Sequence, residues 1–522
     1  MTTKLAKLTA LTLICASTTL SCSKDSPVLP QRDLEGTAVW YPSSDQQSFS
    51  TFWKPAVGYV ADPMPFYDEA AGEWKIMYLQ DFRPNQVATY HPFWGVSTRD
   101  AASYTSLGEL LPCGGAQDQD AALGTGSVIY NPQDKLYYVF YTGNKYDSSV
   151  SGYPQAVMYA TSSDFKTWNR CRSFLLTGAQ DAYSPNDFRD PHVFADDEGL
   201  YHMVISTYQG TKGVLAEYVS SDLRNWEHRG VFMEMMWDRF YECPDVFKMG
   251  DWWYLVYSEI HSAVRKVQYF KGRTLEELKA CTANDAGLWP DYKEGVLDSR
   301  GFYAGKTASN GTDRYIWGWC ADRPGSDNTK VYDWGGALVC HKIRQKEDGT
   351  LVLAAVPAIE SKFAGKQVEA RIMGGDTESF ADGKYSLAAG SYALFSRLGI
   401  CNSISFTATP GSSSDRFSVS FSRGTDSEKW YSLVFNPESG TMMKINFEED
   451  GGQGFIDGSD SYLFPVAETY DVTIHTDNSV LTMYVNDALA YTCRIYGLAK
   501  NPWSLNCLGG TLEITGLNVA KY

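Results

Sequence analysis

Three acidic residues in this 522-residue chain stand in similar local contexts, each next to a proline or a cysteine at the start of a strand-like segment. They are Asp62 in Ala-Asp-Pro, Asp190 in Arg-Asp-Pro and Glu242 in Tyr-Glu-Cys-Pro. Two carboxyl groups can break a glycosidic bond, because one protonates the leaving oxygen while the other attacks the anomeric carbon or activates water. The pattern predicts glycoside hydrolysis if the fold brings the three carboxyl groups together.

The three segments belong to a repeat. Its copies start near residues 62, 126, 190, 245 and 303, at intervals of 64, 64, 55 and 58 residues. A second motif, Ser-Ser-Asp followed four residues later by Trp, occurs at 162–168 and again at 220–226. We interpret this second motif as turns that pack neighbouring repeats and assign it no catalysis. Each repeat holds about four short strands and must stack on its neighbours to bury both faces.

The repeat predicts an all-β fold that starts with a five-bladed β-propeller over residues 41–362. The first strand of each blade would line the central channel, where residues far apart in sequence converge. From residue 363 the repeat is lost, and alternating strands with polar turns predict a β-sandwich over 363–522. A chain of this length exceeds one hydrophobic core, and its 15 Trp and 34 Tyr favour β-structure.

The N-terminus has the pattern of an export signal. Lys4 and Lys7 precede a mostly apolar run over 8–20, and Cys22 follows, as in bacterial lipoproteins. We expect residues 1–22 to be the signal ending at a lipidated Cys22 and 23–40 to be a linker. The protein would then be exported and anchored by lipid at the bacterial outer membrane. Ordinary cleavage near the same point is the alternative.

Charge and metal-ligand spacing exclude other classes of function. The net charge is −17, and no basic stripe is present, so nucleic acid is not expected as a partner. The Cys and His residues show no zinc-binding spacing. We therefore expect neither a metal nor a cofactor.

Taken in order, Asp62-Pro63, residues 188–191 and residues 242–247 resemble glycoside hydrolase family 32, the invertase, inulinase and levanase family. The resemblance implies a retaining β-fructosidase acting on levan, inulin or sucrose, with Asp62 as nucleophile, Glu242 as acid/base and Asp190 as transition-state stabiliser. It also implies five substrate-binding residues, namely Gln80, Trp94, Ser127, Arg189 and Trp319.

Two motifs depart from the family pattern. The family reads Asn-Asp-Pro-Asn-Gly around its nucleophile, whereas residues 61–65 here read Ala-Asp-Pro-Met-Pro. The family's Phe-Ser-Gly-Ser is Gly-Thr-Gly-Ser at 124–127. Two alternatives stay open: a related five-bladed propeller glycosidase acting on another furanoside or a pentosan such as arabinan, and a non-catalytic fructan-binding lipoprotein.

Overall fold

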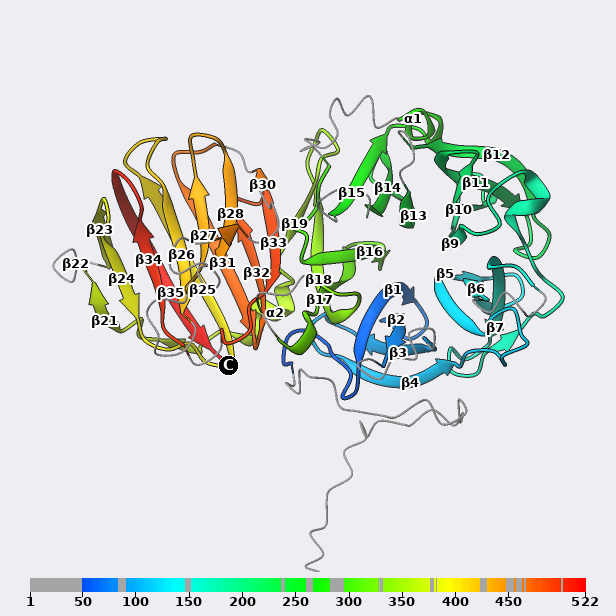
Figure 1. Cartoon of the computed structure of the whole chain (residues 1–522), viewed down its shortest axis with the longest axis horizontal. Helices are drawn as coiled ribbons and strands as arrows, with labels where there is room; N and C mark the ends of the chain where they lie inside the picture. The colour runs from blue at the N-terminus through cyan, green and yellow to red at the C-terminus, as the bar shows by residue number, and fades with distance from the viewer. Residues whose placement is uncertain are drawn as a thin grey trace, which may run out of the picture.

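The structure is a computed structural model with two β-rich domains side by side, a ring of sheets and a two-layered body (Figure 1). It describes residues 49–522 except 83–90, 146–151, 236–239, 260–265, 282–294, 327, 329–331, 376–379, 382, 423–429, 447–454, 457–461, 464–465 and 499–500. The expected signal, Cys22 and the expected linker lie outside the described residues. No helix among the described residues is long and apolar enough to cross a membrane.

The ring consists of five antiparallel blades, each built from consecutive strands, and a pairing of β18 with β1 joins blades 5 and 1 into one eight-stranded sheet. Blade 1 holds β1 (Tyr59–Asp68), β2 (Glu73–Asp81), β3 (Phe93–Thr98) and β4 (Thr105–Leu111). Blade 2 holds β5 (Ala122–Asn131), β6 (Leu136–Asn144), β7 (Gln155–Ser162) and β8 (Asn169–Arg170). Blade 3 holds β9 (Phe188–Ala195), β10 (Tyr201–Gln209), β11 (Lys212–Ser220) and β12 (Glu227–Glu234). Blade 4 holds β13 (Tyr241–Met249), β14 (Trp252–Glu259) and β15 (Lys266–Gly272), and blade 5 holds β16 (Phe302–Ser309), β17 (Arg314–Ala321), β18 (Gly336–Gln345) and β19 (Leu351–Ala354).

The first strands of the blades close the ring. Strands β1, β5, β9, β13 and β16 each contact the next, and β16 contacts β1. A short pairing of Val60 in β1 with Gly336 in β18 joins blade 5 to blade 1. The predicted five-bladed propeller is therefore confirmed, with its blades starting where the sequence repeat starts. Short helices lie in the connections: η1 (Gly178–Asp181), α1 (Leu275–Ala280) and η2 (Pro324–Ser326).

Each first strand has a β-bulge near its start, at the corresponding place in the repeat. The register between the first and second strand shifts at 61/64, 124/126, 189/192, 242/245 and 303/306. Four of these bulges contain a residue with positive φ, namely Asp62, Asp190, Cys243 and Ala304. Proline follows the first three of them, and its missing N–H suits a bulge because no ladder hydrogen bond is lost. The bulges turn the acidic side chains toward the channel.

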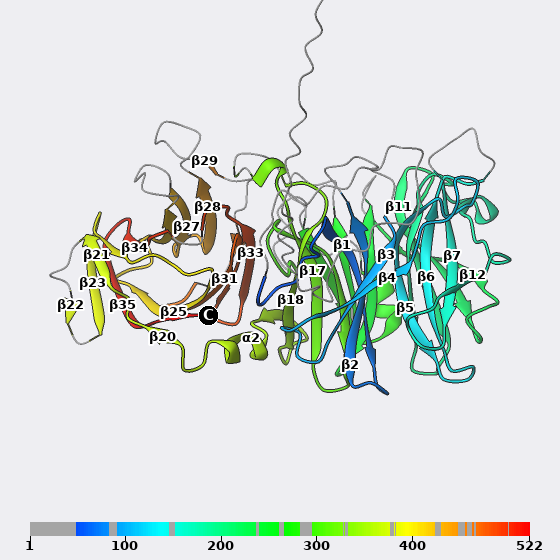
Figure 2. The same ribbon diagram turned by 90° about the horizontal axis from the view of Figure 1, so that it is seen from below.

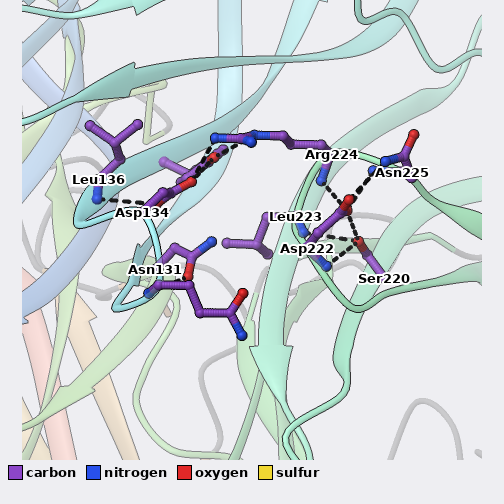
Figure 3. Close-up of polar contacts among 10 residues, drawn as sticks. Asn131, Asp134, Leu136, Ser220, Asp222, Leu223, Arg224 and Asn225 are labelled. Atoms are coloured by element: carbon purple, nitrogen blue, oxygen red, sulfur yellow. Dashed lines mark hydrogen bonds and ion pairs between the residues drawn. The ribbon is translucent and has the colours of Figure 1, made fainter.

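The outer turns of the blades hold neighbouring blades together. In blade 3, Asp222 accepts hydrogen bonds from the backbone N–H of Arg224 (2.9 Å) and Asn225 (2.8 Å), which closes the turn (Figure 3). The guanidinium of Arg224 then reaches Asp134 of blade 2 at 2.8 Å (Figure 3). The Ser-Ser-Asp motif thus serves as a turn and as a contact between blades, as its repeated occurrence predicts.

The second domain is a sandwich of two sheets packed around one apolar core. The two layers are seen in the turned view (Figure 2). Helix α2 (Pro357–Lys362) connects it to the propeller. One sheet holds β20 (Gln367–Val368), β22 (Phe380–Ala381), β23 (Lys384–Ala388), β25 (Cys401–Pro410), β31 (Tyr470–Asp477), β32 (Val480–Val485), β33 (Leu489–Arg494) and β35 (Thr511–Lys521). The other holds β21 (Ile372–Gly375), β24 (Tyr392–Phe395), β26 (Phe417–Ser422), β27 (Trp430–Asn436), β28 (Thr441–Asn446), β29 (Phe455–Ile456), β30 (Tyr462–Leu463) and β34 (Trp503–Cys507).

The bulge of blade 2 depends on a glycine. A Cβ at Gly126 would lie 1.8 Å from the carbonyl oxygen of Phe140, so β5 and β6 could not keep their present separation. We expect Gly126→Ala to lower the free energy of unfolding by about 2–4 kcal/mol. Chemical denaturation measures this loss. Gly509→Ala is the control, because nothing lies within 4 Å of its Cβ, and an equal loss in both variants would contradict the packing argument.

Candidate active site

Asp62 lies in the bulge of β1, and both of its carboxylate oxygens accept hydrogen bonds. The hydroxyl of Thr125 in β5 donates to Oδ2 at 2.6 Å. The indole N–H of Trp319 in β17 donates to Oδ1 at 3.0 Å. Donors to a carboxylate favour its ionised form. The site therefore holds Asp62 as an oriented carboxylate.

Glu242 lies in β13 and is also held through both oxygens. Arg189 donates to Oε1 at 3.0 Å, and the phenol of Tyr303 donates to Oε2 at 2.6 Å. The Glu242 side chain remains 17% exposed, so it can be reached from the channel. Arg189 is itself fixed by Asp187 at 2.8 Å and by the ring of Phe240, whose centroid lies 4.0 Å from the guanidinium carbon.

Asp190 is the most deeply buried of the three acids. Its Oδ2 accepts the backbone N–H of Cys243 at 2.9 Å, and its own N–H donates to Thr142. Burial raises the pKa of Asp190 to about 6, although the charge of Arg189 opposes this rise. The negative charges of Glu242 and Asp62 add to it. Burial disfavours the charge of Arg189, yet Asp190 and Glu242 raise the pKa of Arg189 above its ordinary value.

A single hairpin supplies donors to two of the acids. Tyr303 in β16 pairs with Trp319 in β17, and their rings meet edge to face with centroids 5.4 Å apart. Tyr303 donates to Glu242, and Trp319 donates to Asp62. Both rings are buried, so their positions are set by packing. The geometry of the two carboxylates thus depends on the end of blade 5.

Each first strand carries a buried residue at or just after its bulge. These residues are Met64, Ser127, His192, Asp245 and Lys306. Lys306 donates to the carbonyl of Pro244 at 2.9 Å, and Asp245 is held by Thr307. Burial lowers the pKa of Lys306, and the carboxylates of Asp245, Asp190 and Asp62 oppose this change. Lys306 therefore lies close enough to Asp190 and Asp62 to interact with them electrostatically.

The five expected substrate-binding residues lie in different surroundings. Arg189 and Trp319 contact the acids directly. Ser127 joins two blades, since its hydroxyl donates to the carbonyl of Pro191 at 3.0 Å and accepts the N–H of Val193 at 2.9 Å. The serine hydroxyl thereby holds the bulge that carries Asp190.

Gln80 and Trp94 lie in blade 1 and contact other groups. Gln80 is fully buried; its amide donates to the carbonyl of Val57 at 2.7 Å, while Oε1 has no hydrogen-bond partner among the described residues. Trp94 packs edge to face on Phe82, with ring centroids 6.0 Å apart. The structure therefore brings Asp62, Asp190, Glu242, Arg189 and Trp319 into one set of contacts. Ser127 joins two blades, and the contacts of Gln80 and Trp94 lie outside that set.

Three contributors were not predicted as site residues. Thr125 stands in a motif that departs from the family pattern, and Tyr303 stands at the start of the fifth repeat; neither context reveals which acid the side chain contacts. Lys306 follows a bulge in a strand that otherwise reads as apolar. Its position equivalent to Asp245 in the repeat was the available signal. Among the described residues, no group of three or more His, Cys, Asp or Glu is arranged to hold a metal.

Comparison with known proteins identifies the family of both domains. The glycosyl hydrolases family 32 N-terminal domain matches residues 53–354, and the C-terminal domain of BT1760-like family 32 proteins matches residues 349–519. A sucrose-6-phosphate hydrolase of Vibrio alginolyticus is 26% identical over 351 residues, which are 64% of this chain and 68% of that protein.

Solved structures share the fold at low identity. An exo-inulinase from Aspergillus awamori superposes with a TM-score of 0.70 at 15% identity, covering 91% of this chain and 98% of that one. A variant of fructan 1-exohydrolase IIa from Cichorium intybus, in complex with 1-kestose, gives 0.68 at 13% identity over 91% and 98% of the two chains. The N-terminal family match alone spans more than half of the chain and includes all three acids. This chain therefore belongs to glycosyl hydrolases family 32 and is a glycoside hydrolase of the β-fructofuranosidase group.

Proposed function

We propose that this protein hydrolyses β-fructofuranosidic bonds of fructans (levan or inulin) or of sucrose with retention of configuration, through Asp62, Glu242 and Asp190. The observation that carries the proposal is the different hydrogen bonding of the three acids in one channel. Asp62 is an oriented carboxylate, Glu242 is accessible, and Asp190 is buried. These environments suit a nucleophile, an acid/base and a group that binds substrate hydroxyls, respectively.

In the first step, Asp62 attacks C2 of the fructosyl unit while Glu242 gives its proton to the leaving oxygen. The product of this step is a fructosyl ester of Asp62. In the second step, Glu242 takes a proton from water, and the hydroxide oxygen displaces Asp62 from C2. Asp62 and Glu242 return to their initial protonation states, and the glycosidic bond has been replaced by two hydroxyl groups.

Asp190 supports the transition state through its buried position. A carboxylate away from water forms strong hydrogen bonds to substrate hydroxyls, and these bonds strengthen as positive charge develops on the ring. Arg189 connects this carboxylate to Glu242. The positive charge of Arg189 therefore interacts with both Glu242 and Asp190.

The substrate preference is proposed more broadly than the reaction. Ala61 and Gly124 replace polar and aromatic residues of the family pattern, which removes side chains next to the nucleophile. The family match favours a fructofuranoside over the arabinan alternative. The kestose complex of the chicory exohydrolase relative is consistent with an oligosaccharide substrate. We propose in addition that Cys22 carries a lipid that anchors the exported protein at the bacterial outer membrane.

The acid/base role predicts a large loss of activity for Glu242→Ala. Without the proton donor, cleavage of levan, inulin and sucrose should fall by at least about 1,000-fold. Reducing-sugar release with chromatography of the products measures this loss. Glu227→Gln is the control, since the Glu227 side chain is 70% exposed on β12. A fully active Glu242→Ala variant would contradict the assignment, and a wild-type protein that binds fructan without turnover would support the non-catalytic alternative.

The raised pKa of Asp190 predicts that Asp190→Asn exchanges activity for stability. Below the ordinary pKa of 3.8 the carboxyl is neutral in the folded and the unfolded state; above about 6 it is charged in both, and the folded state carries the desolvation cost. The contribution of this group to the stability of the folded state is therefore greatest at low pH and is lost as pH rises through about 6. At pH 7.5, Asp190→Asn should unfold at a higher temperature than wild type, and its free energy of unfolding should be larger by roughly 1–3 kcal/mol. At pH 4 the variant should gain little stability. Its activity should fall by about 100-fold or more.

Thermal unfolding at the two pH values tests this expectation. Asp222→Asn is the matched control, because backbone hydrogen bonds in its turn lower the pKa of Asp222 to about 2. Its removal should cost stability at pH 7.5, the opposite sign. A gain for Asp190→Asn that is independent of pH would argue against a desolvated carboxylate.

A further inference from the structure

We propose that Thr492 and Arg494 in the sandwich strand β33 are positioning residues for the catalytic acids, so that the second domain completes the active site of the first. This inference rests on the proposed function. Strand β33 lies at the edge of the sandwich that faces the propeller, where it contacts β17 and β19 (Figure 1). The two side chains hold the two ends of the hairpin that supplies Tyr303 and Trp319.

Thr492 holds the segment that enters the hairpin. Its backbone N–H donates to Asp298 Oδ1 at 2.7 Å, and its hydroxyl donates to Asp298 Oδ2 at 2.5 Å. Its carbonyl accepts the hydroxyl of Ser299, which also accepts the N–H of Gly301 at 3.1 Å. Tyr303 follows two residues later. The segment that enters the hairpin is therefore bonded to β33 through Asp298 and Ser299.

The contact between Gly301 and β33 leaves no free space. A Cβ at Gly301 would lie 2.2 Å from the carbonyl oxygen of Thr492. Asp298 is also 3.0 Å from the ring of His341, whose other nitrogen lies 2.7 Å from the hydroxyl of Tyr484. Asp298, Thr492 and His341 are all fully buried. A displacement of β33 would thus move the start of β16.

Arg494 holds the segment that leaves the hairpin. Its Nε donates to the carbonyl of Ala321 at 2.8 Å, and one terminal nitrogen donates to the carbonyl of Cys320 at 2.9 Å. Its other terminal nitrogen donates to Ser479 within the sandwich at 2.9 Å. Arg494 is fully buried, and Cys320 directly follows Trp319. The arginine therefore connects the sandwich to the backbone next to the residue that donates to Asp62.

The hydrogen bonds of Thr492 and those of Arg494 affect different acids through one hairpin. Those of Thr492 hold the segment that carries Tyr303, the donor to Glu242. Those of Arg494 hold the segment next to Trp319, the donor to Asp62. A buried side chain cannot move independently of the backbone that carries it, because the packed interior has no void to accept it. Loss of either set of hydrogen bonds would displace the corresponding donor, Tyr303 or Trp319, by about a fraction of an ångström, and catalysis is sensitive to such displacements.

Variants of the two residues test this role. Thr492→Val keeps the size of the side chain and the backbone N–H but removes the hydroxyl. Arg494→Gln removes the guanidinium that donates to two backbone carbonyls. Each should lower kcat on fructan by about 10-fold or more, with a smaller change in KM. Arg494→Gln should move the acidic limb of the pH–activity profile to higher pH, because the donor to the carboxylate of Asp62 is misplaced, and Thr492→Val should move the alkaline limb to higher pH, because the donor to Glu242 is misplaced. Thr492→Ser should restore kcat and the profile, because it returns the hydroxyl.

Arg344→Gln is the control at the same domain interface. It removes the exposed ion pair of Arg344 with Asp487, 2.8 Å long, which does not touch the hairpin. Its kcat and pH profile should match those of the wild type. Circular dichroism and thermal unfolding establish that each variant is folded at the assay temperature, and Thr492→Val decides the question if Arg494→Gln does not fold.

Folded Thr492→Val with wild-type kcat and an unchanged pH profile would overturn the proposal. So would an equal loss in Arg344→Gln, because the effect would then be general destabilisation of the interface. The proposed function fails in a different way: the wild-type protein itself would then release no fructose. In that case the ratio of variant to wild-type kcat is measured on the glycoside that the wild type does cleave, and the same ratio decides.

Discussion

The burial of several carboxylates of like charge in one narrow channel is the constraint on which the rest of this structure depends. Ionised groups lose hydration when buried, and neighbouring negative charges repel one another. Here the free-energy cost of burying these charges is offset by hydrogen-bond donors to Asp62 and Glu242, by the guanidinium of Arg189 and by the buried ammonium of Lys306. Asp190 retains part of the cost, which is expressed in its raised pKa. Differences between the three environments allow three carboxyl groups to have different roles.

The propeller meets this constraint through repetition. Each first strand has a bulge at the corresponding place in the repeat, and each carries a buried residue at or just after that bulge. Hydrogen bonds between blades, such as that of Ser127 with Pro191, keep the bulges in register. The sandwich contributes where the ring is joined to it, at blade 5. Strands far apart in sequence therefore determine the position of atoms that act on one bond.

The sequence was sufficient to predict the ring and its acids, because both are written in local patterns. The repeat gave the blade starts, and the Asp-Pro and Glu-Cys-Pro segments are the bulges themselves. The donors were harder to predict. Tyr303 and Trp319 are aromatic residues in a chain with many others, and their hydrogen bonds depend on how blade 5 packs against blades 1 and 4. Thr492 and Arg494 lie in a domain without the repeat, so no periodicity related them to the acids.

In the proposed reaction Asp62 forms a covalent bond to the fructosyl unit while Glu242 transfers the proton. Hydrolysis in the presence of methanol tests it most directly, because transfer to methanol gives a methyl fructofuranoside whose configuration at C2 cannot interconvert in water at neutral pH. Proton and carbon NMR of the first-formed product assign that configuration. We expect the methyl β-fructofuranoside, because two successive displacements at C2 retain the configuration. Formation of the methyl α-fructofuranoside would show a single displacement and would contradict the role of Asp62 as nucleophile.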